Sequence, residues 1–399
     1  MENLPEINIG VVGHIDHGKT TLLSKLTGKF TDTHSEELKR GITIKLGYAD
    51  IVIYKEGEKY TAKKTSPSKP VRRVSFIDAP GHEMLMATML SGAGIIDAAL
   101  LVIAANEGIK PQTREHLMAL QVKNIKKIII IQSKIDLVSK EKALENYKEI
   151  KNFIKGTIAE NSQIIPVSAQ QEINIEKIFE AIVNLEIPER NLKDAPLFFI
   201  ARSFDVNKPG TLIKNLNGGV IGGILKQGTL KIGDEIEIKP GLSIKKNNQQ
   251  TYKTLATKII SLYKGNESVK EISPGASISI ETNLDPILTK SDSLAGCIVS
   301  TKGFLPEITT KTKLKIQIFK EVFGAEENQK VEPLKTKELL MLSVNTAITV
   351  GVVEKISKDE KEIELFLNIP IVALKGTNVG IARNFRGHWR LIGCGEIVE

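Results

Sequence analysis

One segment near the start of the chain combines glycine, lysine and threonine at the spacing of a phosphate-binding loop. Residues 13–20 (GHIDHGKT) follow an apolar, strand-like run and precede a helix-like one, which is the context that this pattern requires. Gly13 and Gly18 let backbone amides curl around phosphates, Lys19 reaches the β- and γ-phosphates, and the Thr20 hydroxyl ligates Mg²⁺. The segment predicts a bound nucleotide, and a glycine-rich turn without a ligand is the alternative.

Two further segments carry residues suited to the metal and the base of that nucleotide. Asp78 and Gly81 follow the strand-like run 74–77, where the carboxylate can hold Mg²⁺ through water and the glycine amide can sense the γ-phosphate. Lys134 and Asp136 also follow a strand-like run. A carboxylate at Asp136 can accept from guanine N1–H and N2–H₂ together, and adenine offers no such pair of donors. The sequence therefore predicts GTP or GDP, bound with Mg²⁺, rather than ATP.

The predicted site gathers residues from several loops that follow strand-like runs. Ser168 and Ala169 come directly after the apolar run 164–167, and this position makes them candidates for the base-binding corner. A metal site on His14 and His17 with Asp16 is the alternative for the first loop, but no further His or Cys is spaced to complete a zinc shell. The predicted nucleotide-binding residues are Asp16, His17, Gly18, Lys19, Thr20, Thr21, Ser133, Lys134, Asp136, Ser168, Ala169 and Gln170.

Alternating strand-like and helix-like segments predict how these loops are positioned. Up to about residue 185, short β-branched or apolar runs alternate with amphipathic stretches such as 112–121 and 141–157. This order is typical of a mostly parallel sheet with helices on both faces. We therefore expect an α/β P-loop domain over residues 1–190.

The second half of the chain has a different pattern. After a polar, proline-containing linker at 186–196, helical periodicity almost disappears and short strands separated by Gly, Asn and Lys take over. Such residues fit two all-β barrel domains, which we place at 196–305 and 306–399. Within the first domain, residues 55–73 are polar and rich in Lys, Ser and Pro, so we expect a hairpin tip or loop there.

Bulk properties restrict the class of protein. The chain has 399 residues, 41% of them hydrophobic, which is enough for several packed domains. Its apolar runs fall short of the roughly 20 residues that a membrane span needs, so no membrane association is expected. The two cysteines, Cys297 and Cys394, form no CxxC pair and fit a reducing cytoplasm. The net charge of +8 is compatible with nucleic-acid partners without establishing them.

Four of these segments, in this order, resemble the translational GTPases: residues 13–20, Asp78 with Gly81, Lys134 with Asp136, and Ser168 with Ala169. The first loop, residues 40–44 (RGITI) and residues 78–83 (DAPGHE) are similar to that group. Further similarity, to the gamma-subunit family of archaeal and eukaryotic translation initiation factor 2, lies at residues 38–49, 84–92, 202–210 (RSFDVNKPG) and 387–393 (GHWRLIG). The resemblance runs from the first loop to the last ten residues, and the absence of a long N-terminal extension favours the archaeal branch.

The resemblance implies a slow, switch-type GTPase. Such a subunit carries methionylated initiator tRNA to the small ribosomal subunit, together with alpha and beta subunits of the same factor. The aminoacylated tRNA end is implied to lie between the first and second domains near residues 218–223, where a glycine-rich barrel corner is the alternative. Basic residues around Trp389 could meet tRNA phosphates or simply form a solvated face; they are Arg383, Arg386, His388 and Arg390.

The resemblance also implies roles in hydrolysis and metal binding. His82 is implied to place the attacking water, beside Asp78 and Gly81. Thr43 is implied to ligate Mg²⁺, together with Thr20, while GTP is bound. A second Mg²⁺ is implied near two further groups, the carboxylate of Asp16 and the carbonyl of Gly41.

Two features depart from the family pattern. Residues 55–73 contain no cysteine, whereas the family often has a cysteine-bound zinc knuckle there, so we predict no zinc. Ser133 stands where the base-recognition segment usually begins with Asn. A serine hydroxyl makes fewer hydrogen bonds than an amide. We therefore expect guanine selectivity to survive through Asp136 and nucleotide affinity to fall.

Two other functions compete with this interpretation. The first is an elongation-type or selenocysteine-specific GTPase that delivers another tRNA; residues 202–210 and the segment around Trp389 argue against it. The second is a metabolic P-loop enzyme, such as a GTPase associated with ATP sulfurylase, which shares the first two domains but needs a different partner. Preference among tRNAs would identify the first, and sulfate-dependent GTP turnover the second.

Overall fold

The structure, a computed structural model, describes residues 4–28, 46–79, 86–246, 249–265, 267–322 and 330–399. Segments 29–45 and 80–85 fall outside the described residues. Four residues of the predicted site therefore lie outside them as well: Gly41, Thr43, Gly81 and His82.

A sheet in the order β3-β2-β4-β1-β5-β6-β7 carries the N-terminal part of the chain. From β4 to β7 every neighbouring pair is parallel, whereas β2 runs antiparallel to both β3 and β4. The predicted, mostly parallel sheet is confirmed. Its strands are β1 (Glu6–Gly13), β2 (Gly47–Glu56), β3 (Lys59–Thr61), β4 (Lys69–Asp78), β5 (Ala98–Ala104), β6 (Lys127–Ser133) and β7 (Ile164–Pro166).

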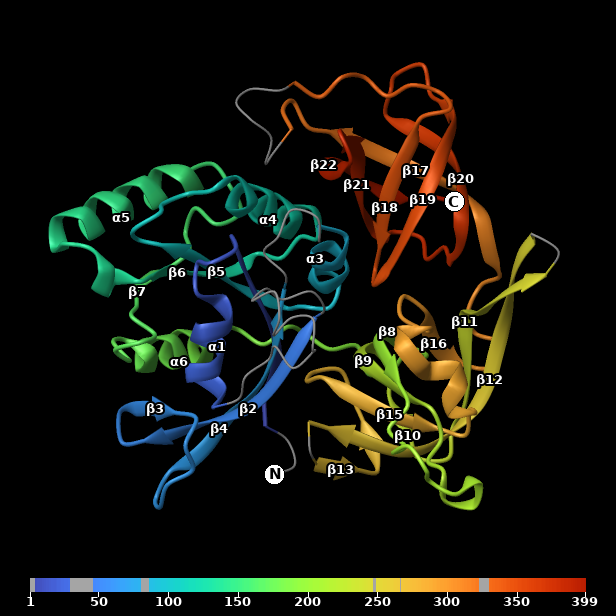
Figure 1. Cartoon of the computed structure of the whole chain (residues 1–399), viewed down its shortest axis with the longest axis horizontal. Helices are drawn as coiled ribbons and strands as arrows, with labels where there is room; N and C mark the ends of the chain where they lie inside the picture. Colours follow the sequence, from blue (N-terminus) through green and yellow to red (C-terminus); the bar gives the residue numbers. More distant parts are fainter. Residues whose placement is uncertain (1–3, 29–45, 80–85, 247–248, 266, 323–329) are drawn as a thin grey trace. The chain divides into compact units, whose positions relative to one another are not determined.

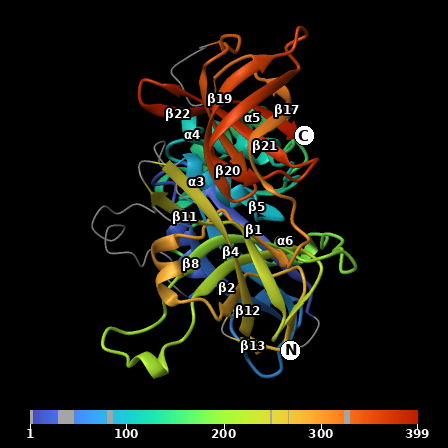
Figure 2. The same ribbon diagram turned by 90° about the vertical axis from the view of Figure 1, so that its right-hand side faces the viewer.

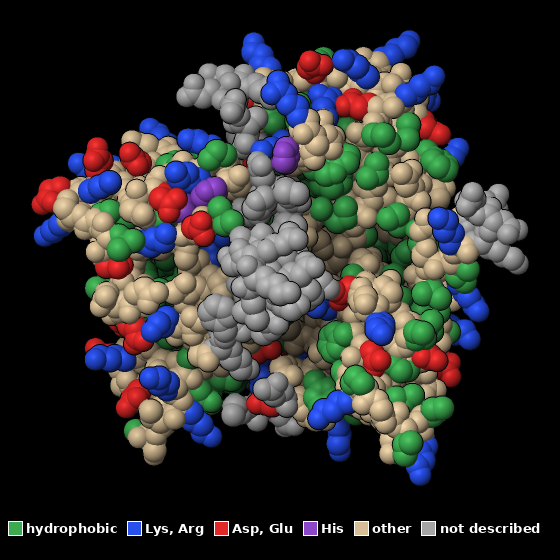
Figure 3. Space-filling view, in the orientation of Figure 1, with side chains coloured by type: hydrophobic (Ala, Val, Ile, Leu, Met, Phe, Trp, Pro, Cys, Tyr) green, Lys and Arg blue, Asp and Glu red, His purple; other side chains and the backbone are tan. Residues whose placement is uncertain are grey.

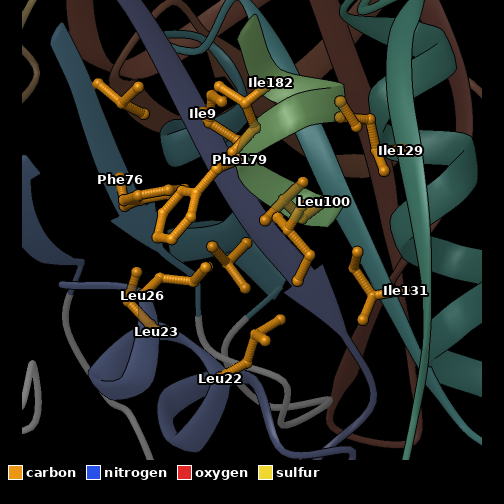
Figure 4. Packing of buried hydrophobic residues seen from close by; sticks show 14 of the residues in the cluster. Ile9, Leu22, Leu23, Leu26, Phe76, Leu100, Ile129, Ile131, Phe179 and Ile182 are labelled. Carbon is orange, nitrogen blue, oxygen red and sulfur yellow. The ribbon is translucent and has the colours of Figure 1, made fainter. Parts of the chain in front are cut away.

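Helices lie on both faces of this sheet, with α1 and α6 on one side and α4 and α5 on the other (Figure 1). Parallel strands buried on both faces read as continuous apolar runs, and β5 (AALLVIA) is buried throughout. Leucines of α1 and Phe179 and Ile182 of α6 pack on the strands in one core (Figure 4). The helices are α1 (Lys19–Thr27), α3 (Met86–Ala93), α4 (Pro111–Val122), α5 (Lys140–Ile154) and α6 (Ile175–Asn184).

The lysine-rich segment 55–73 is more regular than expected. β2 and β4 extend into it and β3 pairs with β2, so only the turn at residues 57–58 and the loop at 62–68 lie outside strands. Tyr60 and Val71 pack against the core that includes α6. Exposed lysines along the ribbon hide the apolar alternation that usually marks a strand, which explains the difference.

A second sheet follows, in the order β11-β16-β8-β9-β15-β12-β13, and an additional β11–β12 pairing closes a ring of six strands. Figure 2 shows β11 and β12 as long neighbouring strands. The sheet comprises β8 (Leu197–Phe204), β9 (Val220–Gln227), β11 (Glu235–Lys246), β12 (Gln249–Lys264), β13 (Glu267–Val269), β15 (Ile278–Thr282) and β16 (Ile298–Thr301), with β10 (Leu230–Lys231) and β14 (Glu271–Ile272) paired beside it.

The last strands form a closed barrel in the order β17-β20-β19-β18-β21-β22. The two predicted β-barrels are therefore confirmed, and closure leaves no exposed edge in either ring. The strands are β17 (Ile308–Ile318), β18 (Leu339–Val344), β19 (Ala347–Ile356), β20 (Glu362–Val372), β21 (Asn378–Phe385) and β22 (His388–Ile397).

Contacts within the chain group it into two compact units. The first contains Met1–Pro188, Ile318–Glu332 and Ala382–Gly393, and the second contains Glu189–Gln317, Pro333–Ile381 and Cys394–Glu399. The three domain ranges 1–190, 196–305 and 306–399 stay a prediction. No helix within the described ranges is both long and apolar enough to cross a bilayer.

Candidate functional site

The predicted phosphate-binding loop connects β1 to α1. β1 ends at Gly13, Gly18 caps α1 in the left-handed conformation, and α1 begins at Lys19. Gly13 has a φ of 142°, and a Cβ there would lie 2.3 Å from the carbonyl oxygen of Val102 on β5, so only glycine fits. The loop thus brings the positive N-terminal end of α1 to the place predicted for phosphates.

Lys19 and Thr20, where the loop meets α1, bond to groups of the loop and of β4. The Nζ of Lys19 donates to the carbonyl oxygen of His14 at 2.7 Å. The hydroxyl of Thr20 donates to the Oδ2 of Asp78 at 3.1 Å. Asp78 ends β4, in parallel register with Val11 of β1. Adjacent strands thus bring together two residues that are 58 positions apart.

The predicted base-binding residues follow β6 and β7, which are neighbours in the sheet. Lys134 adopts a φ of 57° and Asp136 lies exposed in a 3₁₀ turn. The Oγ of Ser168 accepts from the amide of Gln171 at 3.2 Å, which closes the turn that contains Ala169 and Gln170. The turn after β7 and the turn after β6 therefore lie at the same edge of the sheet.

Ser133 has a definite partner in the first loop. Its hydroxyl donates to the carbonyl oxygen of His17 at 2.7 Å, and its side chain is buried. Ser133 therefore ties β6 to the phosphate-binding loop instead of presenting its hydroxyl at the surface. Among the other predicted residues, Asp16 is exposed with a φ of 60°, and Thr21 lies half-buried in α1.

Two groups that sequence reasoning missed also contact this site. The amide of Gly13 donates to the Nδ1 of His116 on α4 at 2.8 Å, and the Nζ of Lys134 lies 3.3 Å from the Oε1 of Glu107. Neither His116 nor Glu107 belongs to a nucleotide motif. Each is far along the chain from its partner, by 103 residues for His116 and Gly13 and by 27 for Glu107 and Lys134. The sequence held no local signal for either contact.

Two buried histidines, one in the loop and one on α4, are held neutral. Burial lowers the pKa of His17 to about 3, although its ring also lies 3.2 Å from the Val102 carbonyl oxygen, which opposes the shift. Burial likewise lowers the pKa of His116 to about 3. Desolvation disfavours the charged imidazolium in both cases. Within the described ranges, no group of three or more His, Cys, Asp or Glu is placed to hold a metal ion.

The glycine-rich segment at the start of β9 serves the barrel. A Cβ on Gly218 would lie 1.8 Å from the Thr282 carbonyl oxygen, which fits the barrel-corner interpretation. The same segment borders a pocket of about 430 Å³ in the second compact unit. Its lining includes Phe204, Val206, Asn217, Val220, Tyr263 and Ser279.

The basic residues near Trp389 divide into two kinds. Arg390 is buried, and its Nη1 donates to the Oε2 of Glu115 on α4 at 3.0 Å; both belong to the first compact unit. Arg383 donates to the Glu332 carbonyl oxygen at 3.0 Å. Arg386 is exposed in the turn between β21 and β22. Arg390 is thus engaged with a carboxylate, which its sequence position did not reveal.

Comparisons with known proteins agree with this arrangement. The elongation factor Tu GTP binding domain model matches residues 4–188, and the initiation factor eIF2 gamma C-terminal model matches residues 310–397. Translation initiation factor 2 subunit gamma of Methanococcus maripaludis strain S2 is 52% identical, over 99% of this chain and 99% of that protein. The chain belongs to the translation initiation factor 2 gamma subunit family. It is therefore a translational GTPase that binds guanine nucleotide.

Other similar proteins support the same family and fold. The protein of that name from Archaeoglobus fulgidus is 52% identical, over 99% of this chain and 95% of its own length. Among solved structures, translation elongation factor SelB of Methanococcus maripaludis with the GTP analogue GppNHp has a TM-score of 0.74 at 26% identity. The match spans 100% of this chain and 80% of the SelB chain. The likeness to SelB is one of fold, whereas the full-length identity is to gamma subunits.

Proposed function

We propose that this chain is a GTP-dependent carrier of methionylated initiator tRNA to the small ribosomal subunit, which switches state on GTP hydrolysis. The observation that carries the proposal is the identity of 52% to a gamma subunit over 99% of both chains. The phosphate-binding loop, Asp78 and the turns after β6 and β7 meet at one edge of the sheet, which supports a nucleotide site there.

The arrangement of side chains supports a role for each predicted group. Lys19 and the start of α1 neutralise phosphate charge. Thr20 and Asp78 present oxygen donors 3.1 Å apart, the donor type that Mg²⁺ prefers, and the ion would supply further positive charge to the phosphates. Asp136 and Lys134 select guanine.

The remaining assignments come from the family resemblance. Thr43 is a further Mg²⁺ ligand, and Asp16 with the Gly41 carbonyl holds a second ion. His82 orients the attacking water, next to Asp78 and the amide of Gly81. All of these except Asp16 and Asp78 lie outside the described residues.

The pocket beside β9 supports the binding of a tRNA end. Apolar and aromatic side chains, including Phe204, Val220 and Tyr263, line it together with polar groups of Asn217, Ser279 and Glu281. Such a lining suits a stacked base with a few orienting hydrogen bonds. On the face shown in Figure 3, Lys and Arg side chains are interspersed with Asp and Glu, so the net charge of +8 does not by itself mark an RNA-binding face.

An exposed apolar loop supports the binding of protein partners. We propose that these partners are the alpha and beta subunits of the same factor. In the loop after β8, Ile213 is 89% exposed and Leu212 is 61% exposed. The side chain of Asn207 braces the loop through the Asn217 carbonyl oxygen at 2.9 Å and the Asn217 amide at 2.8 Å. Apolar side chains that are held out into water in this way are typical of interaction sites. The complex would act in the cytoplasm.

Filter binding tests the proposed function. We would measure binding of methionylated initiator tRNA, uncharged initiator tRNA and a charged elongator tRNA, with GDP and with a GTP analogue, with and without the alpha subunit. We expect charged initiator tRNA to bind best, only with the analogue, and more tightly with alpha. Equal binding of all tRNAs, or binding of none, would overturn the carrier function. Preference for the charged elongator tRNA would favour the alternative, an elongation-type GTPase such as translation elongation factor SelB.

A further inference from the structure

A side chain outside every nucleotide motif holds the first residue of the phosphate-binding loop. The amide of Gly13 donates to the Nδ1 of His116 at 2.8 Å, and the bond is buried. His116 lies within α4, and 2% of its surface is exposed. Because Nδ1 accepts this bond, the neutral ring carries its hydrogen on Nε2.

The bond survives only while the imidazole is neutral. A protonated ring would carry hydrogen on both nitrogens and could not accept from Gly13. Burial lowers the pKa of His116 to about 3, and Lys19, His14 and His17 add to this shift. At neutral pH the ring is therefore a permanent acceptor.

Other contacts hold the same loop from different sides. Close approach to the Val102 carbonyl of β5 leaves no room for a side chain at Gly13. Ser133 of β6 donates to the carbonyl of His17 at 2.7 Å. The His116 bond therefore fixes the entry of the loop, and the Ser133 bond fixes its middle. A loop held in this way offers its amides to phosphates without rearrangement.

We propose that His116 is a positioning residue for guanine nucleotide, which preorganises the phosphate-binding loop through its bond to the Gly13 amide. The proposal rests on the nucleotide site described above. His116 touches neither phosphate nor base in this role, since it acts through the backbone. Without its acceptor, the buried Gly13 amide loses its partner, and the free loop relaxes to regain one. Nucleotide binding must then restore the loop, which lowers affinity.

Three substitutions at one position separate this role from simple packing. His116→Asn places Oδ1 close to where Nδ1 lies and keeps an acceptor for Gly13. His116→Leu fills the position with an apolar side chain that is also branched at Cγ, and this side chain offers no acceptor. His116→Gln keeps a polar amide but moves the acceptor one bond further along the side chain, and it serves as the second acceptor-displacing variant if the Leu chain fails to fold.

The matched control lies on the same helix. Thr113 is fully buried on α4, one turn before His116, and its hydroxyl has no hydrogen-bond partner within the described part of the chain. Thr113→Val keeps the shape of this side chain and removes its hydroxyl. The substitution tests whether any change in polarity on this face of α4 alters nucleotide binding.

The measurement is equilibrium binding of fluorescent GDP and of a GTP analogue to the full chain, with thermal unfolding recorded for every variant. We expect His116→Leu and His116→Gln to weaken binding about tenfold or more, His116→Asn to stay within about threefold of the wild type, and Thr113→Val to change nothing. Equal losses for Asn, Gln and Leu, or no loss for Leu and Gln, would show that His116 only fills space. Failure of the wild type to bind either nucleotide would overturn both the nucleotide site and this proposal.

Discussion

The hydroxyl of Ser133 donates to the carbonyl oxygen of His17 at 2.7 Å, so the last residue of β6 holds the phosphate-binding loop. These residues are 116 positions apart in the chain. The position that usually contributes an Asn side chain is therefore occupied by a smaller group with a single donor. That donor is used for the loop, and we predict that recognition of the base rests on Asp136.

Replacing Ser133 by Ala tests whether Ser133 holds the loop while Asp136 recognises the base. The variant leaves the buried His17 carbonyl without the hydroxyl, which should cost about 1 kcal/mol of stability. It should also weaken GDP and GTP binding several-fold, because the loop is held less firmly, while the preference for guanine is unchanged. Titration with GDP, GTP and ATP analogues measures both effects. Ser139→Ala is the control, since Ser139 caps α5 through the amide of Lys142 and its loss should lower stability without affecting nucleotide binding.

Asp136→Asn should exchange the base preference. An amide offers one acceptor and one donor where guanine needs two acceptors, so GTP affinity should fall at least ~100-fold. Xanthine carries a carbonyl in place of the guanine amino group, and its nucleotide should bind the variant better than GTP does. Competition between GDP and xanthosine diphosphate gives the result. Undiminished GDP binding by the variant would contradict the assignment of Asp136 to the base.

Thr20→Val should remove most of the benefit of Mg²⁺. The variant keeps a β-branched side chain but lacks the hydroxyl that lies 3.1 Å from the Asp78 carboxylate. We expect GTP affinity in excess Mg²⁺ to fall about tenfold or more, and affinity in EDTA to change little. Thr27→Val on the same helix is the matched control, because the Thr27 hydroxyl donates to the Leu23 carbonyl oxygen at 2.8 Å and Thr27 is not among the predicted metal ligands. Equal behaviour of the two variants in Mg²⁺ would argue against Thr20 as a metal ligand.

Stability should decline in acid partly because of His116. Its pKa is about 3 when folded and 6.5 when unfolded, so between these values the unfolded chain binds a proton that the folded chain does not. Stability therefore rises with pH and is lost as pH falls below 6.5. From pH 7.5 to 5, His116→Asn should lose about 2 kcal/mol less unfolding free energy than the wild type. Urea titrations at both pH values give the difference, and identical losses would show that His116 titrates alike in both states.

Ile213→Ser should weaken assembly without weakening the fold. Because Ile213 is 89% exposed, its replacement should leave the unfolding temperature unchanged. Affinity for at least one of the alpha and beta subunits should fall about tenfold, as expected of an apolar anchor. Surface binding assays with each subunit test this, and Leu339→Ser, at a site that is 53% exposed, is the control. Unchanged affinity for both subunits would remove this loop from the interface.

Much of the fold could be predicted because its signals are local. Continuous apolar runs marked β1, β5 and β6, and glycine with lysine marked the turn between β1 and α1. The β2–β4 ribbon was underestimated, since exposed lysines there obscure the alternation of a strand. In the same way, the positive charge of Arg390 was visible in the sequence, but its buried partner Glu115 was not.

The sequence by itself determined the glycine-rich loop between β1 and α1 and the order of one α/β sheet followed by β-barrels, and it predicted a guanine-selecting carboxylate at Asp136. These features depend on residue type and short spacing, which set backbone conformation and periodicity wherever the segment lies. Only the tertiary structure decided that His116 and Ser133 hold the loop and that Glu107 meets Lys134. Such hydrogen bonds require two side chains or backbone groups to arrive within about 3 Å, and that distance is set by how helices and strands pack across the whole sheet.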